Sequence, residues 1–169
     1  MPQVDVEVAG PERRAVFENL MQLYVHDFSE QWFGLERGEL DEDGRFPPYP
    51  LDPYWREADH VPLLVRSDGH LAGFALLNRA SHVGETVDRN MAEFFIARKH
   101  RRGGVGGLAA RTIYSRYPGL WETAVARRNV GALAFWRGVI GGHPEVRGLK
   151  ETDQRTDVWD GALFQFRMG

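Results

Sequence analysis

The sequence predicts one mixed α/β domain over residues 1–169, and three observations support this fold class. The chain is long enough for one domain with a substantial core. Apolar residues make up 43% of it, as in a globular protein. Segments with the two-residue period of strands alternate with segments that have the period of amphipathic helices, and no repeat or linker interrupts them.

The expected elements begin with a strand at 4–8, where valines alternate with acidic residues. Pro11 suits the first turn of a helix over 12–30. Residues 31–59 are expected to form a long loop, with a short helix near 52–58. The remaining strands are expected at 61–66, 71–78, 89–98, 120–126, 144–150 and 157–167, and the remaining helices at 105–117 and 129–139.

Composition excludes several classes of function. The net charge of −3 and the pI near 6.1 offer no positive field for nucleic acid or an anionic membrane. The absence of cysteine excludes disulfides, thiolate catalysis and cysteine-based zinc sites. The histidines lack metal-ligand spacing, so we expect no metal. With no secretory signal and no apolar run of spanning length, a cytoplasmic protein is expected.

A glycine-rich segment between a predicted strand and a predicted helix carries the clearest functional signal. It consists of Arg101, Arg102, Gly103, Gly104, Val105, Gly106 and Gly107. Glycines let the backbone turn sharply and let a ligand approach it closely. The first N–H groups of a helix lack partners within the helix and bind anions together with the helix dipole. With two arginines nearby, the segment predicts a phosphate ligand, and a plain turn is the alternative.

Two nucleotide-binding motifs fit this segment poorly. A P-loop requires Gly-Lys-Ser/Thr after four intervening residues, and this chain has Leu108-Ala109-Ala110 there. The dinucleotide fingerprint G-x-G-x-x-G would end on Ala109, and Glu122 is badly placed to be its acidic residue. A nucleotide-binding regulator is therefore the weaker hypothesis.

The segment resembles the signature R/Q-x-x-G-x-G/A of the GNAT superfamily of N-acetyltransferases, through Arg101-x-x-Gly104-x-Gly106. The flanking order of apolar strand, loop, helix and strand is similar to the family's as well. The next helix of the family has N-x-x-A-x-x-x-Y, and this sequence has Asn129, Ala132 and Trp136 at those positions. The resemblance implies a GNAT-like fold, with a twisted, mostly antiparallel mixed sheet of six or seven strands flanked by helices on both faces.

The resemblance also implies acetyl-CoA as co-substrate. The amides of residues 102–107 would hold its pyrophosphate, and the backbone of residues 96–98 would pair with its pantetheine arm where the fourth and fifth strands splay apart. Asn129 would help to hold the pantetheine, although capping of its helix is an equally simple role. The predicted cofactor-binding residues are Ile96, Ala97, Arg98, Arg101, Arg102, Gly103, Gly104, Val105, Gly106, Gly107, Asn129 and Phe135.

In this family the acceptor amine attacks the thioester directly within a ternary complex, so a base must take a proton from the amine. Glu93 and Glu122 are the candidate catalytic residues. A structural ion pair with Arg89 or Arg98 is the alternative for Glu93. The family often uses the tyrosine of its helix motif as the acid, and the indole of Trp136 cannot replace it. A non-catalytic acyl-CoA-binding module, serving as a sensor or regulator, is therefore the rival hypothesis.

The acceptor is expected to be a small-molecule or peptide amine. The acidic run at 36–43 is either a solvated surface or an attraction for a cationic acceptor. Six aromatic residues either wall the acceptor pocket or anchor the long loop to the core: Trp32, Phe33, Phe46, Tyr49, Tyr54 and Trp55. No nucleic acid or membrane partner is expected, and a homodimer remains open.

Overall fold

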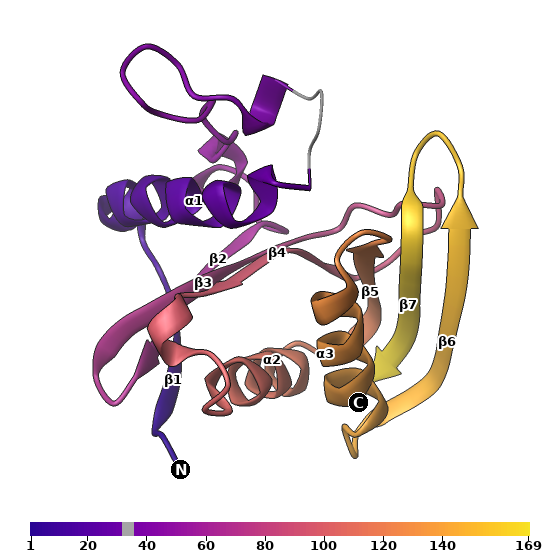
Figure 1. Cartoon of the computed structure of the whole chain (residues 1–169). Coiled ribbons are helices and arrows are strands. Elements are labelled where there is room, and N and C mark those ends of the chain that lie inside the picture. The colour runs from indigo at the N-terminus through magenta and orange to yellow at the C-terminus, as the bar shows by residue number, and fades with distance from the viewer. Residues whose placement is uncertain (32–35) are drawn as a thin grey trace.

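The computed structural model describes residues 1–31 and 36–169. Its seven-stranded sheet has the strand order β1-β2-β3-β4-β5-β7-β6. Neighbouring strands are antiparallel except β4 and β5, which run parallel. Helix α1 lies on one face of the sheet, and α2 and α3 lie on the other (Figure 1). The expected fold class, including the mostly antiparallel sheet with helices on both faces, is confirmed.

The strands are β1 Val4–Val8, β2 Val61–Ser67, β3 His70–Asn78, β4 Arg89–Ile96, β5 Gly119–Ala126, β6 Val146–Arg155 and β7 Asp160–Met168. The helices are α1 Arg14–Ser29, α2 Val105–Arg116 and α3 Val130–Gly141. Strand β6 ends five residues later than expected, and β7 begins three residues later than expected. Because β6 is largely exposed and polar, its own pattern does not reveal where its pairing with β7 ends.

Two apolar clusters hold the layers together. One lies between the sheet and α1 and includes Phe17, Phe74 and Phe95. The other lies between the sheet and the α2–α3 layer and includes Trp121 and Trp136. None of the described helices is both long and apolar enough to cross a bilayer.

The sheet opens between β4 and β5. These strands pair only at Arg89 with Trp121 and at Asn90 with Glu122. A β-bulge near Ala92 interrupts the register of β4 with β3, because Leu77 faces Met91 but Leu76 faces Glu93. On its other side, β5 stays paired with β7 along its whole length. The two parallel strands therefore diverge, and we call the space between residues 91–96 and 123–126 the β4–β5 opening.

Candidate active site

The glycine-rich turn joins the end of β4 to the start of α2. A short 3-10 helix, Arg98–His100, leads into the turn, where Arg102 has a φ of 64°. Gly104 is the N-cap of α2 and has a φ of 89°, which favours glycine. The N–H of Leu108 donates to the carbonyl of Gly104 over 3.0 Å. The N–H groups of residues 105–107 precede this bond and have no partner within the helix.

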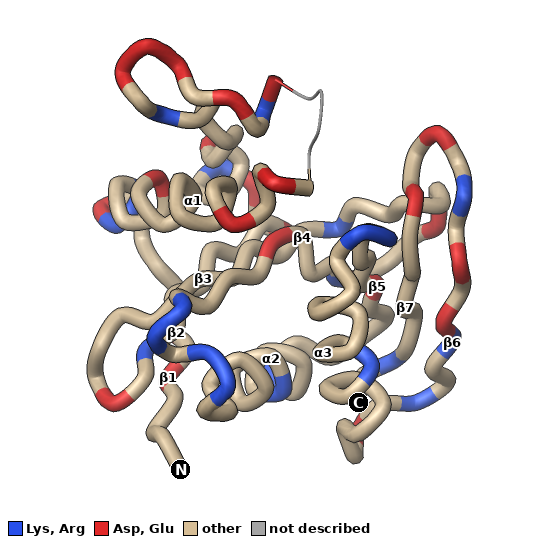
Figure 2. Tube along the Cα trace, in the orientation of Figure 1, with Lys and Arg blue, Asp and Glu red and all other residues tan. Residues whose placement is uncertain are grey.

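The outer side of the turn is open. A Cβ atom added at Gly103 or Gly104 would meet no atom within 4 Å. A hollow of about 400 Å³ beside the turn is lined by Met1, Pro2, Asp68, Lys99, His100, Arg101, Gly103 and Val105. Unpaired helix amides next to this basic segment suit an anion. Figure 2 shows the basic segment between β4 and α2, well away from the acidic segment beyond α1.

Arg98 and Arg101 bind an acidic side chain of α1. Arg98 Nη2 lies 3.0 Å from Asp27 Oδ1, and Arg101 Nη2 pairs with Asp27 Oδ2. Burial raises the pKa of Asp27, but the hydrogen bonds and charges of the two arginines outweigh it and hold that pKa below its usual value. These side chains therefore anchor the turn to α1, while the backbone amides and Arg102 remain on the open side.

The backbone of β4 faces the opening. Ala97 donates its N–H to the carbonyl of Ala72 in β3 over 2.8 Å. Because successive residues of a strand direct their backbone groups to opposite sides, Ile96 directs its own toward the opening. Its carbonyl accepts a hydrogen bond from Arg101 Nε over 2.6 Å. An extended ligand in the opening would lie along this strand as an additional strand does.

Helix α3 supplies the apolar floor of the opening. The Phe135 ring stacks on Phe94 of β4 with ring centroids 5.9 Å apart, and a Cβ atom at Gly106 would lie 3.3 Å from it. Phe135, Gly106 and Ile96 thus meet, as the prediction that all three bind the cofactor requires. Asn129 accepts a hydrogen bond from the N–H of Ala132 over 3.1 Å, so its capping role is confirmed. Its contact with pantetheine stays a prediction.

Trp136 is buried in this floor. Its ring packs against Phe94 at 5.1 Å and against Phe135 at 4.9 Å between centroids. The indole N–H groups of Trp55, Trp121 and Trp159 donate to backbone carbonyls. Trp136 makes no such hydrogen bond with the described residues. Its role in the structure is apolar packing, and it offers no acid to the opening.

A row of polar side chains crosses the sheet at the narrow end of the opening, on the α1 face. Paired in register are Asn78 with Asn90, Asn90 with Glu122, and Glu122 with Gln165. Residues paired in this way share one face of a sheet. Asn90 is buried and donates to Asn78 Oδ1, while its own Oδ1 has no partner within the described residues. The narrow end therefore holds an acceptor oxygen that no described residue satisfies, which suits a ligand that bears an N–H group.

Glu93 lies on the same face, further along β4. The hydroxyl of Tyr24 donates to Glu93 Oε2 over 2.5 Å, and Tyr49 hydrogen-bonds to the same carboxyl. Burial raises the pKa of Glu93 above its usual value, and the two tyrosine hydrogen bonds only partly offset this effect. A carboxyl group with a raised pKa is suited to proton transfer near neutral pH.

The structure does not pair Glu93 with Arg89 or Arg98, although the charge of Arg37 acts on its carboxyl group. Arg98 pairs with Asp27, and the guanidinium of Arg89 lies 5.1 Å from the centroid of the Tyr117 ring. The register of β4 places the Glu93 side chain on the α1 face, where Tyr24 and Tyr49 are its hydrogen-bond partners.

Glu122 is fully buried and is not open to a substrate. Both of its carboxylate oxygens accept hydrogen bonds, from Ser81, His82 and Gln165. Glu122 can therefore contribute to catalysis only by acting on one of these side chains.

The long loop is anchored by some of its aromatic residues. Phe46 is buried, and Trp55 donates its indole N–H to the carbonyl of Ala9 over 3.0 Å. Tyr49 and Tyr54 instead hydrogen-bond to each other, and through Tyr49 they reach Glu93. Burial raises the pKa of Tyr54 to about 12. The predicted pocket residues Trp32 and Phe33 lie outside the described residues.

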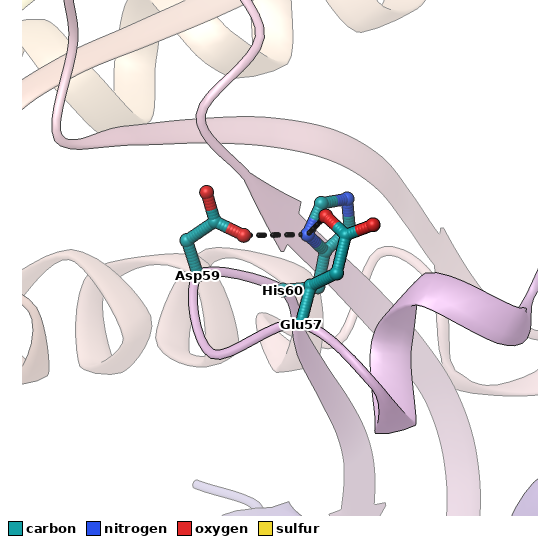
Figure 3. Close-up of side chains that lie close together, drawn as sticks. All are labelled: Glu57, Asp59 and His60. Carbon is teal, nitrogen blue, oxygen red and sulfur yellow. Dashed lines mark hydrogen bonds and ion pairs between the residues drawn. The ribbon is translucent and has the colours of Figure 1, made fainter.

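Glu57, Asp59 and His60 approach one another before β2 (Figure 3). Asp59 Oδ1 lies 2.7 Å from His60 Nδ1, and Glu57 Oε2 lies 3.4 Å from it. The hydrogen bond with His60 lowers the pKa of Asp59. Hydrogen bonding between Asp59 and His60 accounts for this partly exposed group, and the expectation of no metal site stays a prediction.

The sequence did not predict that His82 takes part in the site, nor that Tyr24 and Tyr49 hydrogen-bond to Glu93. Tyr24 is on the apolar face of α1, where a tyrosine is indistinguishable from a core aromatic residue. His82 stands in an irregular connection that has no periodic signal.

The sequence profile of the Acetyltransferase (GNAT) family matches residues 17–139, which include β4, the glycine-rich turn and most of α3. This is well over half of the chain, so the chain belongs to the GNAT acetyltransferase family. No curated protein matches the sequence.

Solved acetyltransferases share the fold at low identity. The aminoglycoside acetyltransferase AAC(6')-Ib, solved with coenzyme A, has a TM-score of 0.64 at 12% identity, over 98% of this chain and 95% of that one. The PaiA N-acetyltransferase of Thermoplasma acidophilum, also solved with coenzyme A, has a TM-score of 0.60 at 12% identity, over 99% of both chains. The spermidine N-acetyltransferase of Vibrio cholerae, solved with CoA and spermine, has a TM-score of 0.60 at 11% identity, over 98% of this chain and 95% of that one.

Proposed function

We propose that this chain is an N-acetyltransferase that moves an acetyl group from acetyl-CoA to a primary amine, with residues 1–169 acting as one domain. One observation carries the proposal: the β4–β5 opening leads directly to the glycine-rich N-terminus of α2. The turn would hold the pyrophosphate of CoA, and the backbone edge of β4 that faces the opening would hold the pantetheine arm. The family membership supports this assignment.

The acyl transfer needs no covalent enzyme intermediate. The amine nitrogen attacks the thioester carbonyl, the C–S bond breaks, and CoA leaves as a thiolate. Glu93 is the proposed base for the proton that the nitrogen loses as it attacks. A thiol pKa of about 8.5 makes the thiolate a tolerable leaving group without an acid at position 136. Solvent is then sufficient to protonate it.

We propose a cationic amine as the acceptor. Asn90 at the narrow end has an acceptor oxygen without a partner in the described part of the chain, and the Glu93 carboxyl lies further along the same face. Figure 2 shows an acidic segment beyond α1, on the chain between α1 and β2. Two of the structural relatives are named for spermidine and aminoglycosides, which are polycationic amines.

The test is release of free CoA thiol from acetyl-CoA with a panel of polyamines, aminoglycosides and lysine peptides. The chain has no cysteine, so a thiol reagent detects CoA without a protein background. We expect turnover with at least one cationic amine. Tight binding of acetyl-CoA without turnover on any acceptor would contradict the enzyme and favour the non-catalytic acyl-CoA-binding module, which Trp136 motivates.

A further inference from the structure

His82 and Glu122 form a dyad at the narrow end of the β4–β5 opening. His82 Nδ1 lies 2.9 Å from Glu122 Oε2, and the backbone N–H of His82 donates to the same oxygen over 2.7 Å. Glu122 Oε1 accepts hydrogen bonds from Ser81 Oγ at 2.9 Å and Gln165 Nε2 at 3.4 Å. The histidine is thereby held by its backbone and its ring at once, while the carboxylate is shielded from any substrate.

These hydrogen bonds define the tautomer of His82. Burial raises the pKa of Glu122, but the hydrogen bonds from His82 and Ser81 outweigh it, and that pKa lies below its usual value. Glu122 is therefore ionised near neutral pH and can only accept, so Nδ1 carries the proton. In the neutral ring Nε2 then has a free lone pair, and it has no partner within the described residues.

The ring is partly exposed. Its side chain is 25% exposed, and the Trp159 ring packs against it with centroids 4.6 Å apart. The connection that carries His82 passes beside the β6–β7 hairpin (Figure 1). The charged groups that act with the ring are Glu122 from β5 and Glu93 from β4, on which the charge of His82 acts. Glu85 from the same connection accepts a hydrogen bond from Gln165, which also contacts Glu122.

We propose that His82 is a catalytic residue whose Nε2 takes the first proton from the acceptor ammonium, and that Glu122 is its positioning residue. This inference rests on the proposed acetyl transfer. Two protons must leave the nitrogen as an ammonium becomes an amide. His82 takes one before attack, which frees the lone pair, and passes it to water. Glu93 takes the second during attack, and the departing thiolate regains one, so that one proton is released per turnover.

The kinetic test uses acceptor amines of graded pKa. Against amines with a pKa near 10, His82→Gln is expected to lower kcat/KM about 100-fold. Against amines that are already neutral at the assay pH, the loss should shrink to less than about threefold, because no first proton has to be removed. Glu122→Gln should follow the same pattern with a smaller loss. His70→Gln, at the exposed start of β3, is the matched control. An equal loss for all amines, or none, would overturn the role of His82.

A second measurement does not depend on turnover. The ring ¹⁵N shifts of His82 should report the Nδ1–H tautomer in the wild-type protein and its loss in Glu122→Gln. An Nε2–H tautomer in the wild-type protein would overturn the inference even if the enzyme is active. Absence of turnover with every amine, despite the expected tautomer, would refute the proposed function and with it the role of His82.

Discussion

At the scale of the residue, Glu93 shows how burial and hydrogen bonding act against each other. Burial disfavours its charged form, whereas the hydroxyl groups of Tyr24 and Tyr49 favour it. The net result is a raised pKa. A base is effective only when it is ionised, so the rate should fall as the pH drops below this pKa.

Removing one tyrosine hydroxyl should therefore move the pH–rate profile. In Tyr24→Phe the ionised form of Glu93 loses a hydrogen bond, its pKa rises further, and the acidic limb of kcat/KM should move to higher pH by up to about one unit. Glu93→Gln should remove that limb and lower turnover about 100-fold while CoA affinity is unchanged. Steady-state rates across pH measure both effects, and Tyr117→Phe, at the end of α2, is the control. An unaltered profile in both Glu93→Gln and Tyr24→Phe would exclude Glu93 as the base.

At the scale of the element, Asp27 connects the last turn of α1 to the end of β4. It binds Arg98, which precedes the glycine-rich segment, and Arg101, which begins it, from the opposite layer of the fold. Ion pairs therefore stabilise the opening together with apolar packing. Because the arginine side chains are 75% and 40% exposed, solvent screens much of the attraction.

We expect Asp27→Asn to lower the free energy of unfolding by about 1–2 kcal/mol at neutral pH. The pKa of Asp27 is depressed in the folded state, so its stabilising contribution is present above its unfolded value and is lost as the pH falls through the folded one. The difference between the variant and the wild-type protein should thus be full above about pH 5 and shrink as the pH falls through the depressed pKa of the folded state. Urea unfolding across pH measures it.

Asp52→Asn, which breaks the exposed pair with Arg14, is the control and should have little effect. A pH-independent difference between Asp27→Asn and the wild-type protein would show that the carboxylate charge is not what stabilises this contact.

At the scale of the whole molecule, cofactor binding should couple to unfolding, because the opening exists only when β4, β5 and the α2–α3 layer are assembled. A ligand that binds only the folded state at a hundred times its Kd stabilises that state by about 2.7 kcal/mol. For a chain of this size, the shift corresponds to roughly 5–10 °C in Tm.

Acetyl-CoA should accordingly raise the Tm of the wild-type protein, and Gly104→Glu should abolish the shift because a carboxylate would enter the anion site at a position with φ of 89°. Gly103→Ala should retain the shift, since a Cβ atom there meets nothing within 4 Å. Thermal melts with and without acetyl-CoA compare the three proteins. A full shift in Gly104→Glu would contradict the location of the pyrophosphate.

The sequence by itself determined the order of the elements, the glycine-rich turn and its place between a strand and a helix. These features are local. Periodicity indicates which face of an element is buried, and a turn that needs glycine is visible as a run of glycines in the sequence. The end of β6 and the start of β7 were missed, because strand pairing and not the sequence pattern sets them.

Only the tertiary structure decided which side chains meet in the site. Tyr24 and Glu93 are 69 positions apart, Asp27 and Arg101 are 74 apart, and His82 and Glu122 are 40 apart. Their contacts depend on strand order, on the bulge in β4 and on the path of an irregular connection. None of these three features produces a periodic pattern in the sequence. Glu122 was recognised as a candidate, but its burial, and hence its dependence on His82, followed only from the assembled sheet.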